Sequence, residues 1–496
     1  MYKSTFTVKN NCSDTMNTKK IIENLNKMKK HFPDLLIKKI KVSLFKHVYI
    51  ITTDSVSSGD KVNDFILKYW ANKNLLNKTF SNIEKEINNF LPAINMKKIT
   101  KEKDVLYYVY NGFTVVLSDY EKEGFAFETR AEIDRGVTES SSEPNIKGPK
   151  DSFTENYQKN IGLIRKRIKS ENLFLDEFTI GKESKTRVGL FYMNNICEDS
   201  LVIEVKQKLR KINIDGVLDN GYLKELFKKE NHSIFPTILS TEKPDNASKN
   251  LLDGKVVIVM ENSPNVLLIP TLLIDFIKNQ EDYNQKAFFS TFIRIIRAIA
   301  FVLAIIMPGF YIAITTCDQE IIPTSLLINF ATQREGVPFP AIIEALILLI
   351  SFEILNEGDS RVPSARTTSL SILGALILGE AAVSAGIISP IMVIVIAITS
   401  ICSLLFSYLD IQAAIRFWRY ILMFFASFFG IIGLFIGILF MLINLCSIKS
   451  FGKPYLMPFS PIYKDSWKNA ILRFSLSNID KRDKYLARKN IIRRKG

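Results

Sequence analysis

Apolar and polar positions follow two different patterns along this chain. Charged residues are frequent over residues 1–290 and again over 447–496, whereas long apolar runs fill 295–446. Within the charged part, short strand-type runs alternate with stretches in which apolar residues recur every three or four positions, as in amphipathic helices. The pattern therefore predicts an α/β part in water, followed by a helical part that is adapted to an apolar solvent.

Residues 1–138 are predicted to form a first α/β module. Its strand-type runs are Leu35–Leu44 and Val48–Thr53, and its helical runs are Asp60–Lys73 and Phe80–Phe90. The run Val105–Leu117 is typical of a β-hairpin that turns at Asn111-Gly112. The polar run over residues 139–150, which contains Ser, Pro and Gly, predicts an exposed linker.

Residues 151–290 are predicted to form a second module of the same kind. Helices are expected at Ser152–Ser170 and Asp199–Lys211, and strands at Thr186–Tyr192, Lys255–Met260 and Val266–Pro270. Strands that alternate with helices indicate a small α/β sandwich.

The region 291–446 holds five apolar segments. They are Ala298–Thr315, Phe339–Leu355, Leu370–Ser389, Ile391–Ser407 and Tyr420–Cys446. A helix that spans a bilayer needs about 20 mostly apolar residues, and the first and last segments contain no charged residue. The sequence therefore predicts an integral membrane protein: two cytoplasmic α/β modules followed by an α-helical transmembrane bundle of five to six segments.

Charge at the two ends predicts the orientation. Arg294 and Arg297 precede the first segment, and no apolar signal-peptide core precedes the modules. Both ends are therefore expected in the cytoplasm, which requires an even number of crossings. The three places where a re-entrant segment or a sixth crossing fits are Ile321–Phe330, Ile391–Ser407 and a hairpin in the Gly430–Gly437 region.

The C-terminal tail, residues 447–496, is strongly basic. Between Lys464 and Lys495 it has eleven Lys and Arg against three Asp, and the whole chain has a formal net charge of +15. Because the tail directly follows a membrane segment, anionic membrane lipids are favoured as its partner over nucleic acid.

Three carboxylates lie on the apolar segments: Glu344, Glu353 and Glu380. A charge at the centre of a bilayer costs at least ~2.5 kcal/mol, so these side chains must face protein or water. Two interpretations remain open. The carboxylates border an aqueous ion pathway, or they form structural ion pairs with Arg366, Arg416 or Arg419.

Prolines interrupt the same region. Pro338, Pro340 and Pro390 border apolar segments, where proline either ends a helix or opens backbone toward a cavity. Phe339 stands between the first two. Gly374, Gly379, Gly430, Gly433 and Gly437 are expected to allow close helix packing.

The sequence contains no constellation typical of an enzyme or of a metal or cofactor site. The three histidines, His31, His47 and His232, are unclustered, and the five cysteines are far apart. We therefore expect a protein without catalytic activity, cofactor or metal.

Several motifs resemble a known family. They are INIDGVLD at Ile212–Asp219, STEKPD at Ser240–Asp245, VPFPAIIEA at Val337–Ala345 and SPIMVIVIAIT at Ser389–Thr399. Their order and spacing are similar to those of the A subunit of GerA-type spore germinant receptors, over roughly residues 150–450.

The resemblance implies a multi-pass protein of the inner membrane of the bacterial spore. It implies a permease-like B subunit that binds the nutrient, a lipoprotein C subunit, and an A subunit that self-associates into a homo-oligomer and forms a nutrient-gated ion channel. Pro338, Phe339, Pro340, Glu344 and Glu353 lie on the family motif. Glu380–Ser384 departs from it, because the acid stands one helical turn earlier here.

Two other functions remain open. A secondary transporter would carry its own small solute or ion, although transporters usually have repeated halves, which this sequence lacks. A structural scaffold would couple the B subunit to other proteins without a pore of its own.

Overall fold

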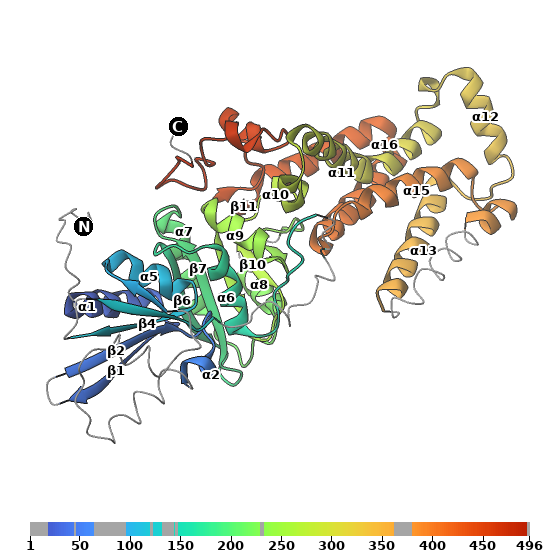
Figure 1. Ribbon diagram of the computed structural model, residues 1–496. Helices are drawn as coiled ribbons and strands as arrows, with labels where there is room; N and C mark the ends of the chain where they lie inside the picture. The colour runs from blue at the N-terminus through green and yellow to red at the C-terminus, as the bar shows by residue number, and fades with distance from the viewer. Residues whose placement is uncertain are drawn as a thin grey trace. The chain divides into compact units, whose positions relative to one another are not determined.

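The computed structural model describes residues 18–43, 46–63, 96–119, 123–130, 143, 147–228, 233–361 and 379–493 (Figure 1). The chain divides into two compact units. The strand-containing unit comprises Met1–Phe227, Ser240–Ile269 and Lys484–Ile491, and the helical unit comprises Lys228–Leu239, Pro270–Asp483 and Ile492–Gly496.

The first half of the strand-containing unit is a five-stranded antiparallel sheet in the order β1-β2-β4-β5-β3. Its strands are β1 (Leu35–Ser43), β2 (Lys46–Thr53), β3 (Met96–Ile99), β4 (Phe113–Ser118) and β5 (Gly124–Glu128). Its helices are α1 (Thr18–Met28), η1 (Lys29–His31), α2 (Gly59–Val62) and α5 (Glu102–Tyr110). The predicted strands at Leu35–Leu44 and Val48–Thr53 are confirmed. The predicted helix Phe80–Phe90, and Asp60–Lys73 beyond residue 63, lie outside the described residues.

The predicted hairpin at Val105–Leu117 is wrong. Its first part is helix α5, and only its second part is a strand, β4. Asn111 and Gly112, with φ of +79° at the glycine, end the helix instead of turning a hairpin. Val105 and Val109, one helical turn apart, are both buried, so tertiary packing overrides the strand preference of this β-branched and aromatic run.

The second half is another five-stranded sheet, in the order β6-β7-β9-β10-β8. Its strands are β6 (Leu173–Ile180), β7 (Thr186–Met193), β8 (Leu239–Thr241), β9 (Val256–Met260) and β10 (Val266–Ile269). Its helices are α6 (Tyr157–Arg167), α7 (Asp199–Lys211), α8 (Asn220–Lys228) and α9 (Pro244–Leu252). Every residue of β9 and β10 is buried, which explains their uninterrupted apolar runs. The predicted strands and the helix Asp199–Lys211 of this region are confirmed, and the predicted helix Ser152–Ser170 is shorter, as α6. Elements β6, β8, α8 and α9 were not predicted from the sequence.

A buried ion pair joins the two halves. Nη2 of Arg165 on α6 donates to Oδ1 of Asp34, which precedes β1, at 2.6 Å, and both side chains are 1% exposed. Beside this pair, His31 stacks on Phe174 of β6 with ring centroids 4.5 Å apart, and its Nδ1 lies 3.2 Å from Asp176. The halves therefore pack through specific polar contacts as well as apolar ones.

Part of the predicted exposed linker, Glu143, is buried. Its carboxylate accepts a hydrogen bond from Thr241 of the STEKPD motif at 3.0 Å, and the side chain is 7% exposed. Burial raises the pKa of Glu143 to about 7, against the opposing charge of Lys243. The expectation of an exposed position is therefore wrong for this residue, because the strand-containing unit offers the carboxyl a hydrogen-bond donor.

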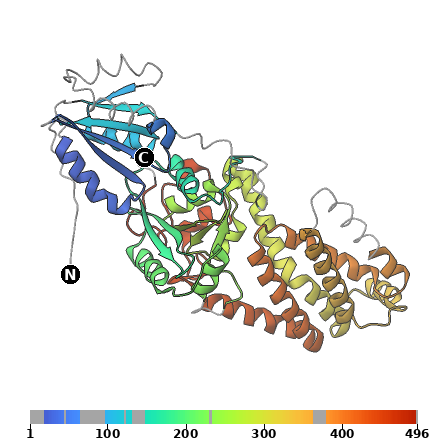
Figure 2. The ribbon, with the colours of Figure 1, turned by 90° about the horizontal axis from the view of Figure 1, so that it is seen from below.

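The described residues of the helical unit form four long helices. They are α11 (Ala287–Thr316), α13 (Ala341–Arg361), α15 (Pro390–Leu404) and α16 (Leu409–Ser447). Shorter elements are α10 (Leu273–Ile277), η3 (Gln280–Asn284), η4 (Gln319–Ile321), α12 (Thr324–Arg334), β11 (Lys449–Ser450), β12 (Lys453–Pro454), η5 (Lys464–Asn469) and η6 (Leu476–Asn478). The long helices pack side by side, as Figure 2 shows.

Helix α16 folds back on itself at Gly430. The backbone there has φ of +59° and ψ of −142°, which is not helical. The rings of Phe425 and Phe440 lie 6.1 Å apart, whereas residues at that spacing in a straight helix would be about 22 Å apart. A Cβ on Gly437 would lie 2.5 Å from the side chain of Leu422. The two arms of α16 are therefore antiparallel neighbours, at one of the places where the sequence analysis expected a hairpin.

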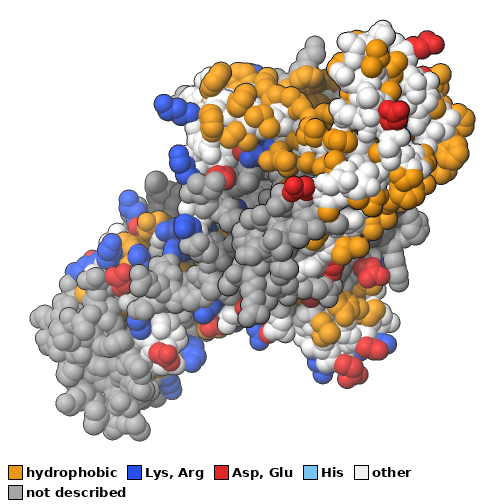
Figure 3. All heavy atoms as spheres, turned by 90° about the vertical axis from the view of Figure 1, so that its right-hand side faces the viewer, with side chains coloured by type: hydrophobic (Ala, Val, Ile, Leu, Met, Phe, Trp, Pro, Cys, Tyr) orange, Lys and Arg blue, Asp and Glu red, His pale blue; other side chains and the backbone are white. Residues whose placement is uncertain are grey.

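Two of the described helices, α11 and α16, are long and apolar enough to cross a membrane. Of the other predicted segments, Phe339–Leu355 with its two carboxylates lies in α13 from Ala341 onward, and most of Ile391–Ser407 forms the shorter α15. Residues 370–378 of the predicted segment Leu370–Ser389 lie outside the described residues. Hydrophobic side chains gather over the face of the helical unit seen in Figure 3. On α15, Ile394 and Ile401 are 58% and 62% exposed.

Candidate functional site

Glu344 is fixed at the first turn of α13 by two neighbouring elements. Its backbone N–H donates to the Pro340 carbonyl at 3.2 Å, so the proline precedes the helix without breaking it. The Glu344 carboxylate is 0% exposed. It accepts the backbone N–H of Ser389 at 2.8 Å, and Nη2 of Arg334 lies 3.3 Å from it. This carboxylate therefore ties together the end of α12, the start of α13 and the start of α15.

The surroundings of Glu344 are apolar. Tyr311 and Ile312 of α11 pack in one cluster with Ala341 and Ala345 of α13 and with Met392 of α15. Burying an unpaired charge in such a cluster would cost free energy. The carboxylate therefore needs both the hydrogen bond from Ser389 and the ion pair with Arg334.

Glu353 lies further along α13 and has a different environment. Its carboxylate pairs with Nη1 of Arg416, on the first arm of α16, and the two side chains remain 30% and 35% exposed. One turn later, Arg419 is buried and donates Nε to the carbonyl of Ala304 on α11 at 2.7 Å. The structure thus contains one of the ion pairs named above, and it leaves Glu353 more accessible than Glu344.

The remaining sequence candidates are not gathered with these two carboxylates. Pro338, Phe339 and Pro340 are exposed in the segment between α12 and α13. Pro390 opens α15 directly after its N-cap Ser389, so it begins a helix. Glu380 is exposed, and it forms no ion pair with another of the described residues. Of these candidates, Pro340 lies next to Glu344 through its carbonyl, and Pro390 lies next to it through Ser389.

Sequence reasoning missed a carboxylate that caps the reversal of α16. Oδ2 of Asp318, just past the end of α11, accepts the backbone N–H of Ile431 at 2.7 Å. A carboxylate at the first residue of the second arm satisfies an otherwise unpaired N–H and favours the helix dipole. No local signal reveals this contact, because the two residues are 113 positions apart.

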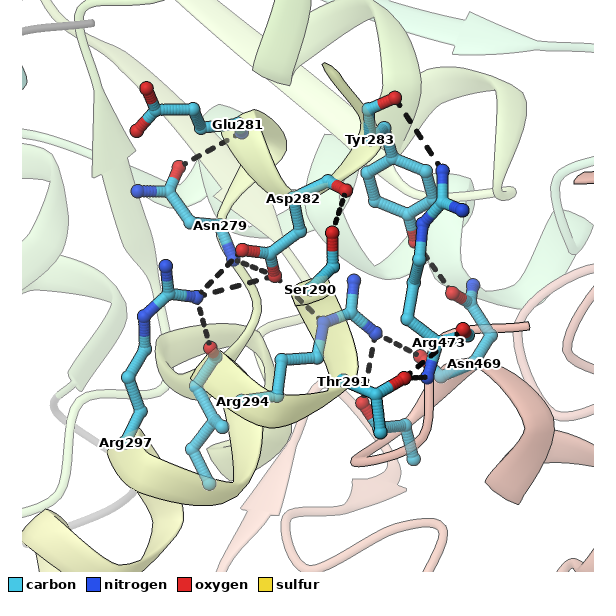
Figure 4. Close-up of polar contacts among 12 residues, drawn as sticks. Asn279, Glu281, Asp282, Tyr283, Ser290, Thr291, Arg294, Arg297, Asn469 and Arg473 are labelled. Carbon is cyan, nitrogen blue, oxygen red and sulfur yellow. Dashed lines mark hydrogen bonds and ion pairs between the residues drawn. The ribbon is translucent and has the colours of Figure 1, made fainter. Parts of the chain in front are cut away.

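A second missed cluster lies at the start of α11, drawn in Figure 4. Asp282 of η3 accepts Nε of Arg294 at 2.7 Å and Nη1 of Arg297 at 2.9 Å. Arg294 also donates to the backbone carbonyls of Asn469 and Ala470 in the tail, at 3.3 and 3.1 Å. The arginines read from the sequence as orientation signals are thus also structural contacts.

Metal binding has no geometric support in the described part of the chain. No three His, Cys, Asp or Glu side chains lie close enough there to hold a metal ion. The expected lack of catalysis and of cofactors stays a prediction.

Comparison with known proteins gives one consistent result. A model of the Bacillus/Clostridium GerA spore germination protein matches residues 23–485. The chain is 34% identical over 462 residues to spore germination protein KA of Bacillus subtilis (strain 168), covering 93% of this chain and 85% of that protein. It is 29% identical over 458 residues to spore germination protein GerLA of Bacillus cereus, covering 92% and 93%.

Two further similarities concern a membrane protein and a solved structure. The chain is 33% identical over 457 residues to the uncharacterized membrane protein YfkQ of Bacillus subtilis (strain 168), covering 92% of this chain and 89% of that one. The N-terminal domain of the A subunit of the Bacillus megaterium spore germinant receptor GerK3 is 25% identical, with a TM-score of 0.41. That match covers 53% of this chain and 99% of that chain.

Proposed function

Because this chain belongs to the GerA family of spore germination proteins, we propose that it is the A subunit of a nutrient-sensing germinant receptor. In this proposal, copies of the chain oligomerise into a nutrient-gated cation channel that triggers germination. The observation that carries the proposal is an apolar helical unit that retains carboxylates on one of its helices, at Glu344 and Glu353.

Two helices that can cross a bilayer, in a chain of this family, indicate a membrane location. We place the protein in the inner membrane of the spore, with the strand-containing unit and both chain ends in the cytoplasm. The reversal at Gly430 supports an even number of crossings, because it returns the chain to the end of the helical unit where α16 begins.

The packing directions support six crossings. Phe301 of α11 contacts Phe406 just after α15, with ring centroids 5.9 Å apart, while Tyr311 packs near Met392 at the start of α15. Helices α11 and α15 therefore run antiparallel. Together with α13, the two arms of α16 and the segment Leu370–Ser389 predicted from the sequence, the proposed bundle would have six crossings. Six is the upper value of the range expected from the sequence.

A cation pathway built by several copies would need an accessible acid. Glu353 fits that role better than Glu344, because its ion pair with Arg416 is partly exposed whereas Glu344 is enclosed. A ring of carboxylates repeated by oligomer symmetry favours cations over anions. Glu344 would then hold α12, α13 and α15 in place around the path.

The partners in this proposal are a permease-like B subunit, a lipoprotein C subunit and further copies of this chain. A transporter would use the same two carboxylates on a small solute or ion, and a scaffold would use them only as ion pairs. The alternatives can be separated by neutralising each carboxylate in turn and measuring cation release, germination and assembly.

We expect Glu353→Gln to alter cation release and germination rate while protein level and assembly stay normal. Glu344→Gln should instead lower the amount of assembled protein, since Arg334 and the Ser389 N–H lose a buried anion. Glu380→Gln is the matched control on an exposed acid. Spores carrying each variant would be assayed for cation release, with A-subunit level measured by immunoblot. If all three variants behave like the parent, the carboxylates have no pathway role.

A further inference from the structure

Part of the C-terminal tail is fixed against the first turns of α11. Arg294 is 0% exposed and donates to the carbonyls of Asn469 and Ala470. One turn earlier, the Thr291 hydroxyl accepts the Arg473 N–H at 2.9 Å and lies 3.1 Å from the Arg473 carbonyl, to which it donates. Figure 4 shows these contacts converging from α11 and from the tail. Residues 469–473 therefore lie at the same level as the beginning of this apolar helix.

The cluster around these contacts has more positive than negative charge. Arg294, Arg297 and Arg473 meet there, and the carboxylate of Asp282 is shared by the first two. Arg473 is 6% exposed and lies over the Tyr283 ring at 5.2 Å. Its Nη2 donates to the Tyr283 carbonyl at 3.5 Å, and its Nε has no hydrogen-bond partner. Among the described residues, no carboxylate pairs with Arg473. A buried cation without a counter-charge is costly, so an anion from outside the chain is expected.

The tail segment that contains Arg473 and the start of α11 both expose apolar side chains. In the tail, Ile462, Trp467, Leu472 and Phe474 are 68%, 44%, 42% and 40% exposed. At the start of α11, Phe288, Phe289 and Phe292 are 89%, 52% and 55% exposed. Lys468, next to the tryptophan, is exposed as well. Exposed aromatic side chains mixed with cations at the end of an apolar helix are typical of the membrane–water interface.

We propose that residues 462–474 form an interfacial anchor, and that Arg473 binds the phosphate of an anionic phospholipid headgroup. The exposed apolar side chains of the tail and of α11 would enter the same layer of the bilayer, while Arg473 and Lys468 meet the headgroups. The proposal goes beyond the channel function, because it requires only the membrane location and would hold equally for a transporter or a scaffold.

The test uses the full-length protein in nanodiscs of phosphatidylcholine, with or without phosphatidylglycerol. Native mass spectrometry would count retained phosphatidylglycerol for the parent, for Arg473→Gln and for Arg488→Gln. Arg488→Gln is the matched control, because it removes a tail cation that is 64% exposed and pairs with Glu198 in the strand-containing unit. Brominated phospholipids quench the fluorescence of a tryptophan that lies in the bilayer, so they would report the depth of Trp467. The part of the quenching that is lost in Trp467→Phe belongs to this residue.

We expect Arg473→Gln to weaken phosphatidylglycerol retention about fivefold, the effect of roughly one interfacial cation, and Arg488→Gln to leave it unchanged. Trp467 should be quenched in the parent. The proposal would be overturned if the parent and Arg473→Gln retained phosphatidylglycerol equally, or if both variants lost it equally. It would also be overturned if the fluorescence of Trp467 were not quenched. Displacement of the lipid by inorganic phosphate would assign the site to a soluble anion instead. Failure of the protein to insert at all would contradict the membrane location, and hence the proposed function, not this site alone.

Discussion

Replacing Gly430 by alanine is expected to abolish correct folding of the helical unit. The backbone there combines φ of +59° with ψ of −142°, a region that is almost exclusive to glycine. An added Cβ would overlap Oδ2 of Asp318 and lie 2.7 Å from Cβ of Cys317. Strain and overpacking together cost roughly 3 kcal/mol or more. Displacing Asp318 would also remove the cap on the Ile431 N–H.

The matched control is Gly358→Ala, because a Cβ at Gly358 meets no atom within 4 Å and the residue lies inside α13. This change should leave stability equal or slightly higher, since alanine favours a helix. Size-exclusion chromatography after graded heating in detergent would compare the two variants with the parent. If Gly430→Ala stays monodisperse to the temperature of the parent, α16 does not reverse at Gly430.

The second large effect is expected at the buried pair of the strand-containing unit. Arg165→Met should leave the Asp34 carboxylate without its cationic partner. This carboxylate is 1% exposed, and its other oxygen accepts the Ser55 hydroxyl at 2.7 Å. Breaking one partner of a buried pair costs about 3–5 kcal/mol. The guanidinium also packs over the rings of Phe32 and Tyr110, at 5.1 and 5.5 Å, and those contacts would be lost too.

A double-mutant cycle separates charge from packing. Combining Arg165→Met with Asp34→Leu should recover much of the loss, because no charge then remains buried. Arg187→Met, on an exposed arginine, should change stability by less than about 0.5 kcal/mol. Denaturant unfolding followed by hydrogen exchange of β1 and α6 would measure the effect. A loss at Arg165 as small as that at Arg187 would contradict a role for the pair in joining the two halves.

The sequence was sufficient where one periodic pattern determines an element. Asp199–Lys211 was predicted to the residue, because apolar positions one turn apart, such as Leu201 and Val205, both face the core. The buried strands β9 and β10 were found from short apolar runs bounded by turn residues. Hydropathy also located the long helices α11 and α16, since an uncharged apolar run of about 20 residues is typical of a helix that can span a bilayer.

The sequence was insufficient to predict caps and ion pairs that join residues far apart in the chain. The cap of Ile431 by Asp318 and the pairing of Arg294 with tail carbonyls join residues more than a hundred positions apart. Ion pairs of these carboxylates were predicted as one of two alternatives. Arg416, the partner of Glu353, was among the three arginines named, whereas Arg334, the partner of Glu344, was not. At Val105–Leu117, burial of one helical face outweighed a local preference for strands.

The proposed channel is tested by the cation conductance of this chain reconstituted in planar bilayers with the B and C subunits of the proposal. On addition of nutrient, we expect discrete cation-selective conductance that depends on this chain and is changed by Glu353→Gln. Gly430→Ala, which should not assemble, serves as the control without a channel. A complex that assembles and binds nutrient, yet conducts no more than this control, would contradict the channel and favour the scaffold. Slow, saturable uptake without discrete conductance would favour the transporter.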